Sequence, residues 1–262
     1  MSDEILLSTV DGIATVTLNR PEKRNAINYG MWQRLPGIWS HIDNDPKIRA
    51  VLITGMGDEA FSAGADIGEF ERYRGNSRQG KQWGRVLDEA LEGLNNLTKP
   101  TIAVIKGYCI GGGCELAAFA DMRFAAENAR FGITAARLGI VLGYRETRRL
   151  IQLVGPANAS YILLSARHLD AKEALLMGLV NLVLPLEHLA DYTNKLVMDI
   201  AALAPLSHKG NKEVIRINLV NPSLEGLSQA QEEVPFGVFD SDDFREGRSA
   251  FIEKRRPKFE GK

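Results

Sequence analysis

A run of three glycines is the segment of this sequence with the clearest chemical use. Residues 106–121 read KGYCIGGGCELAAFAD, so glycines 111–113 follow an apolar segment and precede a helix-like one. Glycine allows unusual φ values and close approach of a ligand to the backbone. Free N–H groups and the positive end of a helix that begins here attract an anion. The segment predicts a site for a developing oxyanion, such as an enolate oxygen, unless the glycines serve only strand–helix packing.

A carboxylate follows these glycines directly. Glu115 falls in the first turn of a helix expected at residues 114–120, among apolar neighbours. There it can simply complement the helix dipole. Beside an oxyanion site, partial burial would instead raise its pKa toward neutrality and suit it to general acid–base work.

A second segment also exposes its backbone. Residues 61–70 read FSAGADIGEF, with small side chains at 62–65. A loop of this kind can aim a main-chain N–H at a substrate oxygen, although alone it also fits an ordinary turn into a helix.

A phosphate loop is the other interpretation of the glycine run at 111–113. However, no G-K-[ST] follows these residues, and they do not form G-x-G-x-x-G.

Charged and aromatic residues gather in a later loop, at Tyr144, Arg145 and Glu146. Glu146 can provide a second carboxylate, Arg145 can pair with it or bind an acidic substrate group, and Tyr144 can donate a hydrogen bond. The alternative is structural: Glu146 forms an ion pair with Arg145 or Arg148 where a helix at 147–154 begins.

Alternating strands and helices are expected to position these residues. The apolar runs 50–54 and 101–105 are typical of strands covered on both faces. Period-2 and helical spacings predict the remaining elements in an α/β core with a helical C-terminal region. Further strands are expected at 12–19 and 180–184, and helices at 29–43, 84–97, 157–165, 171–177, 189–203, 207–219 and 242–255.

Composition excludes several function classes. The 262 residues are 45% hydrophobic and carry a net charge of −1, which gives no general field for nucleic acid or an anionic membrane. We expect no signal peptide, transit segment, membrane span or metal-ligand array, and hence a cytoplasmic protein. Cys109 and Cys114 are expected to be buried, reduced thiols.

Five ordered motifs resemble the crotonase (enoyl-CoA hydratase/isomerase) superfamily over nearly the whole chain. They are LNRPEKRNAIN at 18–28, AFSAGADIGEF at 60–70, IKGYCIGGGCELAAFAD at 105–121, FGITAARLGI at 131–140 and AFIEKRRPKF at 250–259. The resemblance implies an α/β, crotonase-like spiral of ββα units at 1–195. It also implies a helical trimerisation or lid region at 196–262, in a homotrimer or a hexamer built as a dimer of trimers.

The resemblance also implies roles for single residues. The N–H groups of Ala65 and Gly112 form the oxyanion hole for an acyl-CoA thioester, with CoA as part of the substrate, no separate cofactor and no metal. Lys23 and Arg24 match a basic pair near the CoA phosphates. The remaining CoA positions are Ala63, Asp66 and Ile67 along the adenine and pantetheine path, and Phe251 and Lys254 in a tail that closes over CoA.

One position departs from the family pattern. Hydratases of this family use two glutamates around one water, and the second is expected where this chain has Ala135. Hydration then needs Glu115, with Glu146 as a substitute partner, whereas isomerisation can use one carboxylate and decarboxylation mainly needs the oxyanion hole. A non-catalytic acyl-CoA binder is the alternative from another class. The leading prediction is an enoyl-CoA hydratase/isomerase, with an acyl pocket built from residues 68–84 and 144–150.

Overall fold

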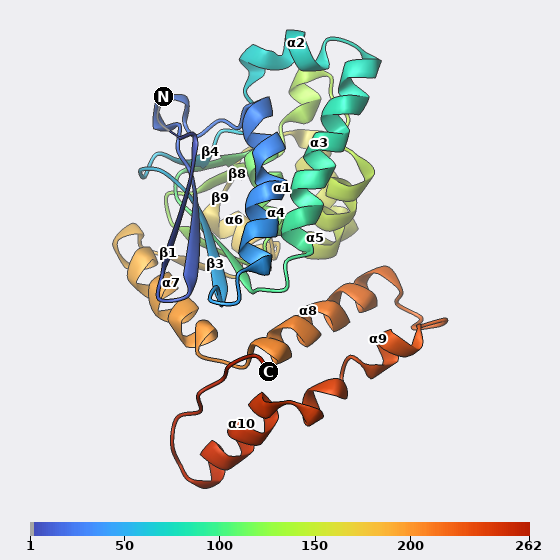
Figure 1. Ribbon diagram of the computed structural model, residues 1–262. Helices are drawn as coiled ribbons and strands as arrows, with labels where there is room; N and C mark the ends of the chain where they lie inside the picture. The colour runs from blue at the N-terminus through green and yellow to red at the C-terminus, as the bar shows by residue number, and fades with distance from the viewer. Residues whose placement is uncertain (1–2) are drawn as a thin grey trace.

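Repeated ββα units form the middle of the chain, from residue 50 to residue 165. The computed structural model describes residues 3–262. In each unit the first strand joins a six-stranded sheet of order β1-β2-β3-β5-β7-β10, and the second joins a four-stranded sheet of order β4-β6-β8-β9. The predicted spiral is therefore present (Figure 1). The units consist of β3 (Ala50–Gly55), β4 (Ala60–Ser62), α2 (Phe70–Arg74) and α3 (Ser77–Asn95); β5 (Thr101–Ile105), β6 (Tyr108–Ile110) and α4 (Gly112–Phe119); and β7 (Met122–Ala126), β8 (Arg130–Gly132) and α5 (Tyr144–Ser165).

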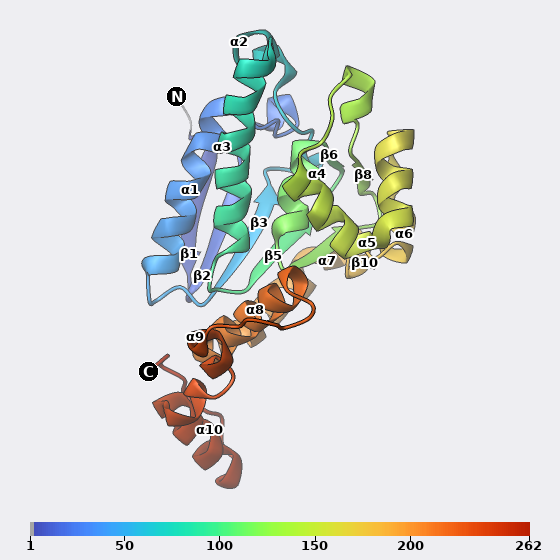
Figure 2. The ribbon, with the colours of Figure 1, turned by 90° about the vertical axis from the view of Figure 1, so that its right-hand side faces the viewer.

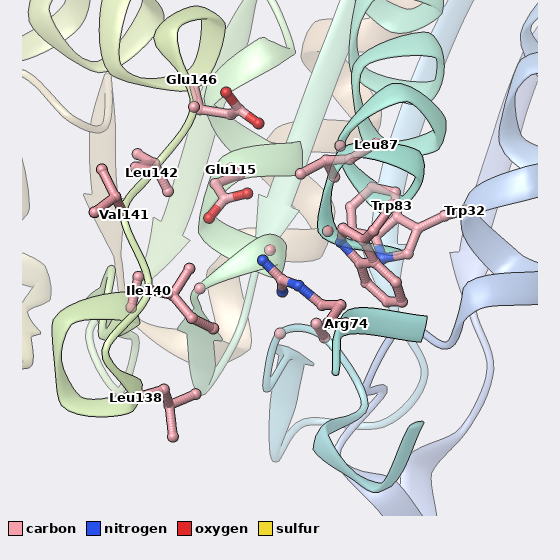
Figure 3. Close-up of a pocket in the computed structure, with 18 of the residues that line it drawn as sticks. Trp32, Arg74, Trp83, Leu87, Glu115, Leu138, Ile140, Val141, Leu142 and Glu146 are labelled. Atoms are coloured by element: carbon pink, nitrogen blue, oxygen red, sulfur yellow. The ribbon is translucent and has the colours of Figure 1, made fainter. Parts of the chain in front are cut away.

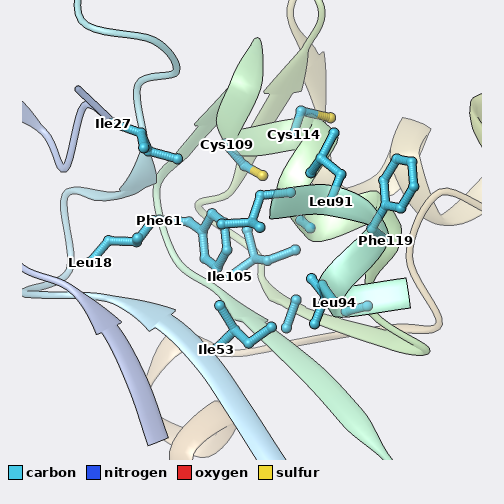
Figure 4. Packing of buried hydrophobic residues seen from close by; sticks show 14 of the residues in the cluster. Leu18, Ile27, Ile53, Phe61, Leu91, Leu94, Ile105, Cys109, Cys114 and Phe119 are labelled. Carbon is cyan, nitrogen blue, oxygen red and sulfur yellow. The ribbon is translucent and has the colours of Figure 1, made fainter. Parts of the chain in front are cut away.

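The six-stranded sheet is covered on both faces, as the continuous apolar runs predict. The N-terminal hairpin of β1 (Ile5–Val10) and β2 (Ile13–Leu18) forms its edge. Alternate residues of β3 face opposite ways: Ile53 joins the core beneath α1 (Tyr29–Asn44) and α3, while Leu52 packs toward α7 (Leu186–Ala201). Figure 4 shows the first of these cores, in which strand and helix side chains interdigitate.

The four-stranded sheet brings together the two segments predicted to supply main-chain donors, residues 61–70 and 106–121. Strands β4, β6 and β8 pair in parallel, so their carboxyl ends lie at one edge. Residues 63–65 follow β4, Gly111 follows β6, and residues 134–135 follow β8. Three separate motifs of the sequence therefore meet at one place.

The C-terminal part extends away from this body (Figure 2). Helices α8 and α9 have no buried residue. The boundary predicted between residues 195 and 196 falls inside α7, and the division into a core and a trimerisation or lid region stays a prediction. The elements after α5 are β9 (Leu169–Asp170), α6 (Ala171–Leu176), β10 (Leu182–Leu184), α7, α8 (Pro205–Val220), α9 (Gln229–Glu233) and α10 (Asp242–Ile252).

Several boundaries differ from the predicted ones for local reasons. Helix α3 begins seven residues before the predicted start at Gly84, because the Asn76 side chain accepts a hydrogen bond from the N–H of Gln79 and caps a polar first turn. The two helices predicted at 147–154 and 157–165 form one element with a kink at Gly155, whose φ of 74° is not helical. Among the described residues, no helix is long and apolar enough to cross a membrane.

Candidate active site

A cavity of about 420 Å³ opens where the parallel strands of the smaller sheet end. Its walls come from the loop after β4, helices α2 and α3, the start of α4, and the segment from residue 134 to the first turn of α5 (Figure 3). Apolar side chains form most of the walls, and the charged residues among them include Arg74, Glu115 and Glu146. A largely apolar cleft with a few polar groups is typical of a small-molecule site.

The N–H groups of Ala65 and Gly112 lie at this cavity. A methyl group placed on Gly112 would lie 3.5 Å from the nitrogen of Ala65, so the two segments nearly touch. Ile27 bridges to the neighbours of Ala65, donating to the carbonyl of Gly64 and accepting from the N–H of Asp66. The N–H of Ala65 therefore points away from Ile27, and the N–H of Gly112 lies at a helix start. Neither donates a main-chain hydrogen bond within residues 3–262.

Glycine is required at several points around these donors. Gly64 has φ 100° and Gly111 has φ 51°, both in the region that disfavours residues with a Cβ. A Cβ on Gly113 would come within 2.6 Å of the Ser62 side chain, where α4 packs against β4. The glycine run thus serves both packing and exposure of the backbone, which were the two interpretations of its sequence.

Glu115 lies in the first turn of α4 and is only 8% exposed. Burial raises its pKa to about 8, the nearby Glu146 carboxyl adds to the rise, and Arg74 opposes it. A carboxyl that titrates near neutrality can accept and return a proton under physiological conditions. The geometry therefore permits the acid–base role suggested for Glu115.

Glu146 brings a second carboxyl group to the same cavity. It begins in the first turn of α5, is 6% exposed, and its Oε2 has no hydrogen-bond partner in the part of the chain that the structure describes. Burial raises its pKa as well. A Cβ on Gly143 would lie 2.4 Å from this Oε2, so glycine at that position leaves space for the carboxyl group.

The ion pairs expected for Glu146 in its structural role do not form among residues 3–262, and a catalytic role for this residue stays a prediction. Arg145 Nε lies 3.7 Å from Asp88 Oδ2 and its Nη1 lies 3.6 Å from Glu92 Oε1, so Arg145 ties α5 to α3. Within the described residues, Arg148 forms no salt bridge with Glu146 either. Asp88 and Glu92 of α3 therefore hold Arg145 away from Glu146. The spacing of residues along the sequence did not show that these two acidic side chains face α5. Tyr144 is 96% exposed at the cavity rim.

Two residues of the cavity, Trp32 and Arg74, were not predicted from the sequence. The indole N–H of Trp32 is buried without a hydrogen-bond partner among residues 3–262, and its ring lies against Gly112. Arg74 stacks over the rings of Phe70 and Trp83 and directs its guanidinium into the cavity (Figure 3). The charged FERYR segment after the small-residue loop was the available signal for Arg74, but its spacing does not show which arginine points inward.

Only some of the residues predicted to bind CoA line the cavity, and the roles of all of them stay predictions. Ala63 and Ile67 line the cavity. Asp66 caps the turn after the loop; burial opposes its ionisation, but hydrogen bonds from Arg20 and the N–H of Gly68 prevail and lower its pKa. Lys23 is exposed, and Arg24 forms an ion pair with Glu59 at 2.6 Å.

Other residues of the predicted acyl pocket and tail also differ in their relation to the cavity, among them the aromatic residues Tyr73 and Trp83 of the stretch 68–84. Ala135 lines the cavity and adds no titratable group there. Trp83 also lines it, whereas Tyr73 stacks against Tyr29 with ring centroids 4.2 Å apart. Phe251, near the end of α10, and Lys254, just after it, are exposed and do not line the cavity of their own chain.

Known proteins resemble this chain along its whole length. The family model for enoyl-CoA hydratase/isomerase matches residues 8–262. The short-chain-enoyl-CoA hydratase of Clostridium acetobutylicum is 35% identical over 257 residues, 97% of this chain and 96% of that protein. The 2,3-dehydroadipyl-CoA hydratase of Escherichia coli K12 is 34% identical over 263 residues, 99% of each. The crystal structure of an enoyl-CoA hydratase/carnithine racemase from Magnetospirillum magneticum has a TM-score of 0.95 and 37% identity, covering 100% of this chain and 97% of that one.

The agreement of fold and motifs defines a crotonase-fold enzyme of acyl-CoA chemistry. More narrowly, the chain belongs to the enoyl-CoA hydratase/isomerase family. The resemblance predicted from five motifs is confirmed, and the comparisons support an enzyme of the hydratase/isomerase class over a non-catalytic binder.

Proposed function

We propose that this enzyme adds water across the double bond of a 2-enoyl-CoA thioester, with Glu115 and Glu146 on either side of the water. The observation that carries the proposal is the buried, unpartnered Oε2 of Glu146 in the cavity that Glu115 also lines. It supplies the second carboxyl group that Ala135 cannot. The names of the hydratases from Clostridium acetobutylicum and Escherichia coli support the same reaction class.

In the proposed reaction, the thioester carbonyl oxygen accepts hydrogen bonds from the N–H groups of Ala65 and Gly112. Water gives a proton to an ionised carboxylate while its oxygen bonds to carbon 3, and the double-bond electrons move onto the carbonyl oxygen as an enolate. Each donor can stabilise this charge by about 3–4 kcal/mol. A protonated carboxyl group then gives its proton to carbon 2, which yields the 3-hydroxyacyl-CoA.

The two glutamates suit an acid and a base acting together. Burial raises the pKa of both, and the Glu146 carboxyl raises that of Glu115 further. Two carboxyl groups that share a dry site tend to hold one proton between them. The pair then contains one donor and one acceptor at neutral pH, without a metal or a separate cofactor; CoA is part of the substrate.

The proposal is tested with Glu115→Gln and Glu146→Gln, each assayed for loss of the conjugated double bond and for a product heavier by one water. We expect each change to lower kcat by about 10²- to 10⁴-fold, because either the acid or the base is lost. Glu89→Gln is the matched control, since Glu89 is exposed on α3 and does not line the cavity. Full hydration by Glu146→Gln would overturn the two-carboxylate mechanism.

The alternative reactions give different products in the same assays. Migration of the double bond that needs Glu115 but not Glu146 would identify a single-carboxylate isomerase. Loss of CO2 from a malonyl-type thioester, with both glutamates dispensable, would identify a decarboxylase that uses mainly the oxyanion hole.

A further inference from the structure

Arg74 is a cation in the cavity that the proposed hydration does not use. Its guanidinium carbon lies 4.8 Å from the centre of the Phe70 ring and 5.0 Å from that of the Trp83 ring. These aromatic faces hold the side chain in place and favour its charge. Figure 3 shows the guanidinium directed into the cavity, toward Glu115 and the segment that carries Leu138 and Ile140.

The other arginine of the cavity wall is in a different situation. Arg145 has its charge balanced by Asp88 and Glu92 at 3.7 and 3.6 Å. Arg74, although half-buried, forms no salt bridge and no side-chain hydrogen bond within residues 3–262. Its five N–H donors face a cavity whose walls are mostly apolar, so burial carries a cost that a protein acceptor does not offset.

The neighbouring glutamates do not replace such an acceptor. Burial lowers the pKa of Arg74, but an arginine remains a cation at neutral pH. Glu115, with its pKa of about 8, is mainly protonated there. Glu146, the ionised member of the pair in the proposed reaction, attracts Arg74 but forms no salt bridge with it among the described residues. An anionic group placed beside Arg74 would therefore meet its positive charge at close range and little repulsion from Glu115.

We propose that Arg74 binds a carboxylate carried by the acyl group, so that the preferred substrates are thioesters of dicarboxylic acids. The planar guanidinium matches a carboxylate through two parallel hydrogen bonds, which places the acyl group as well as attracting it. The carboxylate sits either at the far end of the acyl chain or on carbon 2. The inference rests on the proposed acyl-CoA site, and it names the substrate class of that site.

Binding of saturated thioesters tests the inference without any hydration step. Calorimetry would compare adipyl-CoA with hexanoyl-CoA for a terminal carboxylate, and malonyl-CoA with acetyl-CoA for one on carbon 2. We expect at least one acid to bind about 10- to 100-fold more tightly than its uncharged counterpart, the range measured for charged hydrogen bonds. Arg74→Gln should abolish that preference and change the affinity for the uncharged thioester much less than the affinity for the acid.

Arg72→Gln is the matched control, because Arg72 lies on the same short helix, stacks over Tyr73 and does not line the cavity. It should keep the full preference for the acid. Equal affinities in both pairs, a preference that survives Arg74→Gln, or a loss of affinity for every thioester alike would overturn the assignment. Tight binding of the acids without turnover of any enoyl-CoA would contradict the proposed reaction while supporting the role of Arg74.

Discussion

Glu115 is the residue at which folding and catalysis make opposite demands. It is buried beside another carboxyl group, and its pKa rises from 4.5 to about 8. The ionised form that can accept a proton is thus the form that folding disfavours. A catalytic carboxyl group of this kind is expected to reduce stability, and that reduction depends on pH.

Replacing Glu115 should therefore change how stability depends on pH. Because the folded-state pKa of Glu115 is raised, the stability contributed by its protonated form is fully present below about pH 4.5. This contribution is lost progressively as the pH rises from about 4.5 to about 8. Between about pH 5 and 7.5, the wild type should lose on the order of 3 kcal/mol more unfolding free energy than Glu115→Gln. Denaturant unfolding at both pH values measures this. Parallel behaviour of the two proteins would mean that Glu115 ionises normally.

Gly112 tests the main-chain donors. In Gly112→Ala the new Cβ would lie 3.1 Å from Trp32 Cζ2 and 3.5 Å from the nitrogen of Ala65, where the thioester oxygen is expected. We expect kcat/KM to fall by about 10²- to 10³-fold while the fold persists, since alanine is a good helix former. Steady-state kinetics and circular dichroism check both. Unchanged kinetics would contradict the oxyanion hole.

The sequence predicted some of these residues and not others. Glu115 and the two donors lie within contiguous motifs whose local conformation, a glycine turn into a helix, follows from residue type. Trp32, Arg74 and the partners of Arg145 depend on how α1, α2 and α3 rotate against one another, and spacing along the chain does not set that rotation. The departure at Ala135 was visible in the sequence, but burial of Glu146 in the same cavity was not.

At the scale of elements, helix α3 has an unusual wall facing the cavity. Gly80 and Gly84 are one turn apart and both line it, and a Cβ at either would meet no atom within 4 Å. Glycine inside a helix costs about 1 kcal/mol relative to alanine. The open space that the two glycines leave beside Trp83 and Leu87 is therefore expected to accommodate the acyl chain.

Substitutions at Gly84 separate stability from acyl-chain length. Gly84→Ala should raise the unfolding free energy by about 0.5–1 kcal/mol. Gly84→Leu should fill the open space beside α3. It should lower kcat/KM for an eight-carbon enoyl-CoA, relative to a four-carbon one, by about tenfold or more. Gly37→Ala is the control, because Gly37 is exposed on α1, has open space around a Cβ and lies outside the cavity. An unaltered chain-length profile in Gly84→Leu would place the acyl chain elsewhere.

Elements also explain why the two glutamates stay together. Arg149 of α5 donates to the carbonyls of Ala118 and Ala120 at the end of α4, and Arg123 of β7 donates to the carbonyl of Ala120 as well. Positive groups at a helix C-terminus complement its dipole. The contact fixes α5, which carries Glu146, against the helix whose first turn carries Glu115.

At the scale of the whole molecule, the C-terminal helices lack a core of their own. Helices α8 and α9 have no buried residue, and large apolar side chains are exposed nearby, among them Phe236 at 61%, Phe251 at 85% and Ile252 at 72%. A segment that has several exposed large apolar side chains and no buried core of its own is typical of a surface that contacts another chain. These side chains support the homotrimer or hexamer that the family resemblance implies, which stays a prediction.

Phe236→Asp should therefore weaken assembly. Burying a phenylalanine contributes about 1.5–3 kcal/mol at each contact, and a closed ring repeats that contact in every subunit, so one charge per chain should shift the particle toward monomers. Sedimentation velocity at micromolar concentration would show the change in mass, with Val10→Asp, 67% exposed beside the β1–β2 turn, as the control that keeps the wild-type mass. A monomeric wild type, or a Phe236→Asp particle of unchanged mass, would mean that this face does not hold subunits together. If Phe251 and Lys254 close over the CoA of a neighbouring subunit, dissociation should also raise the KM for the thioester.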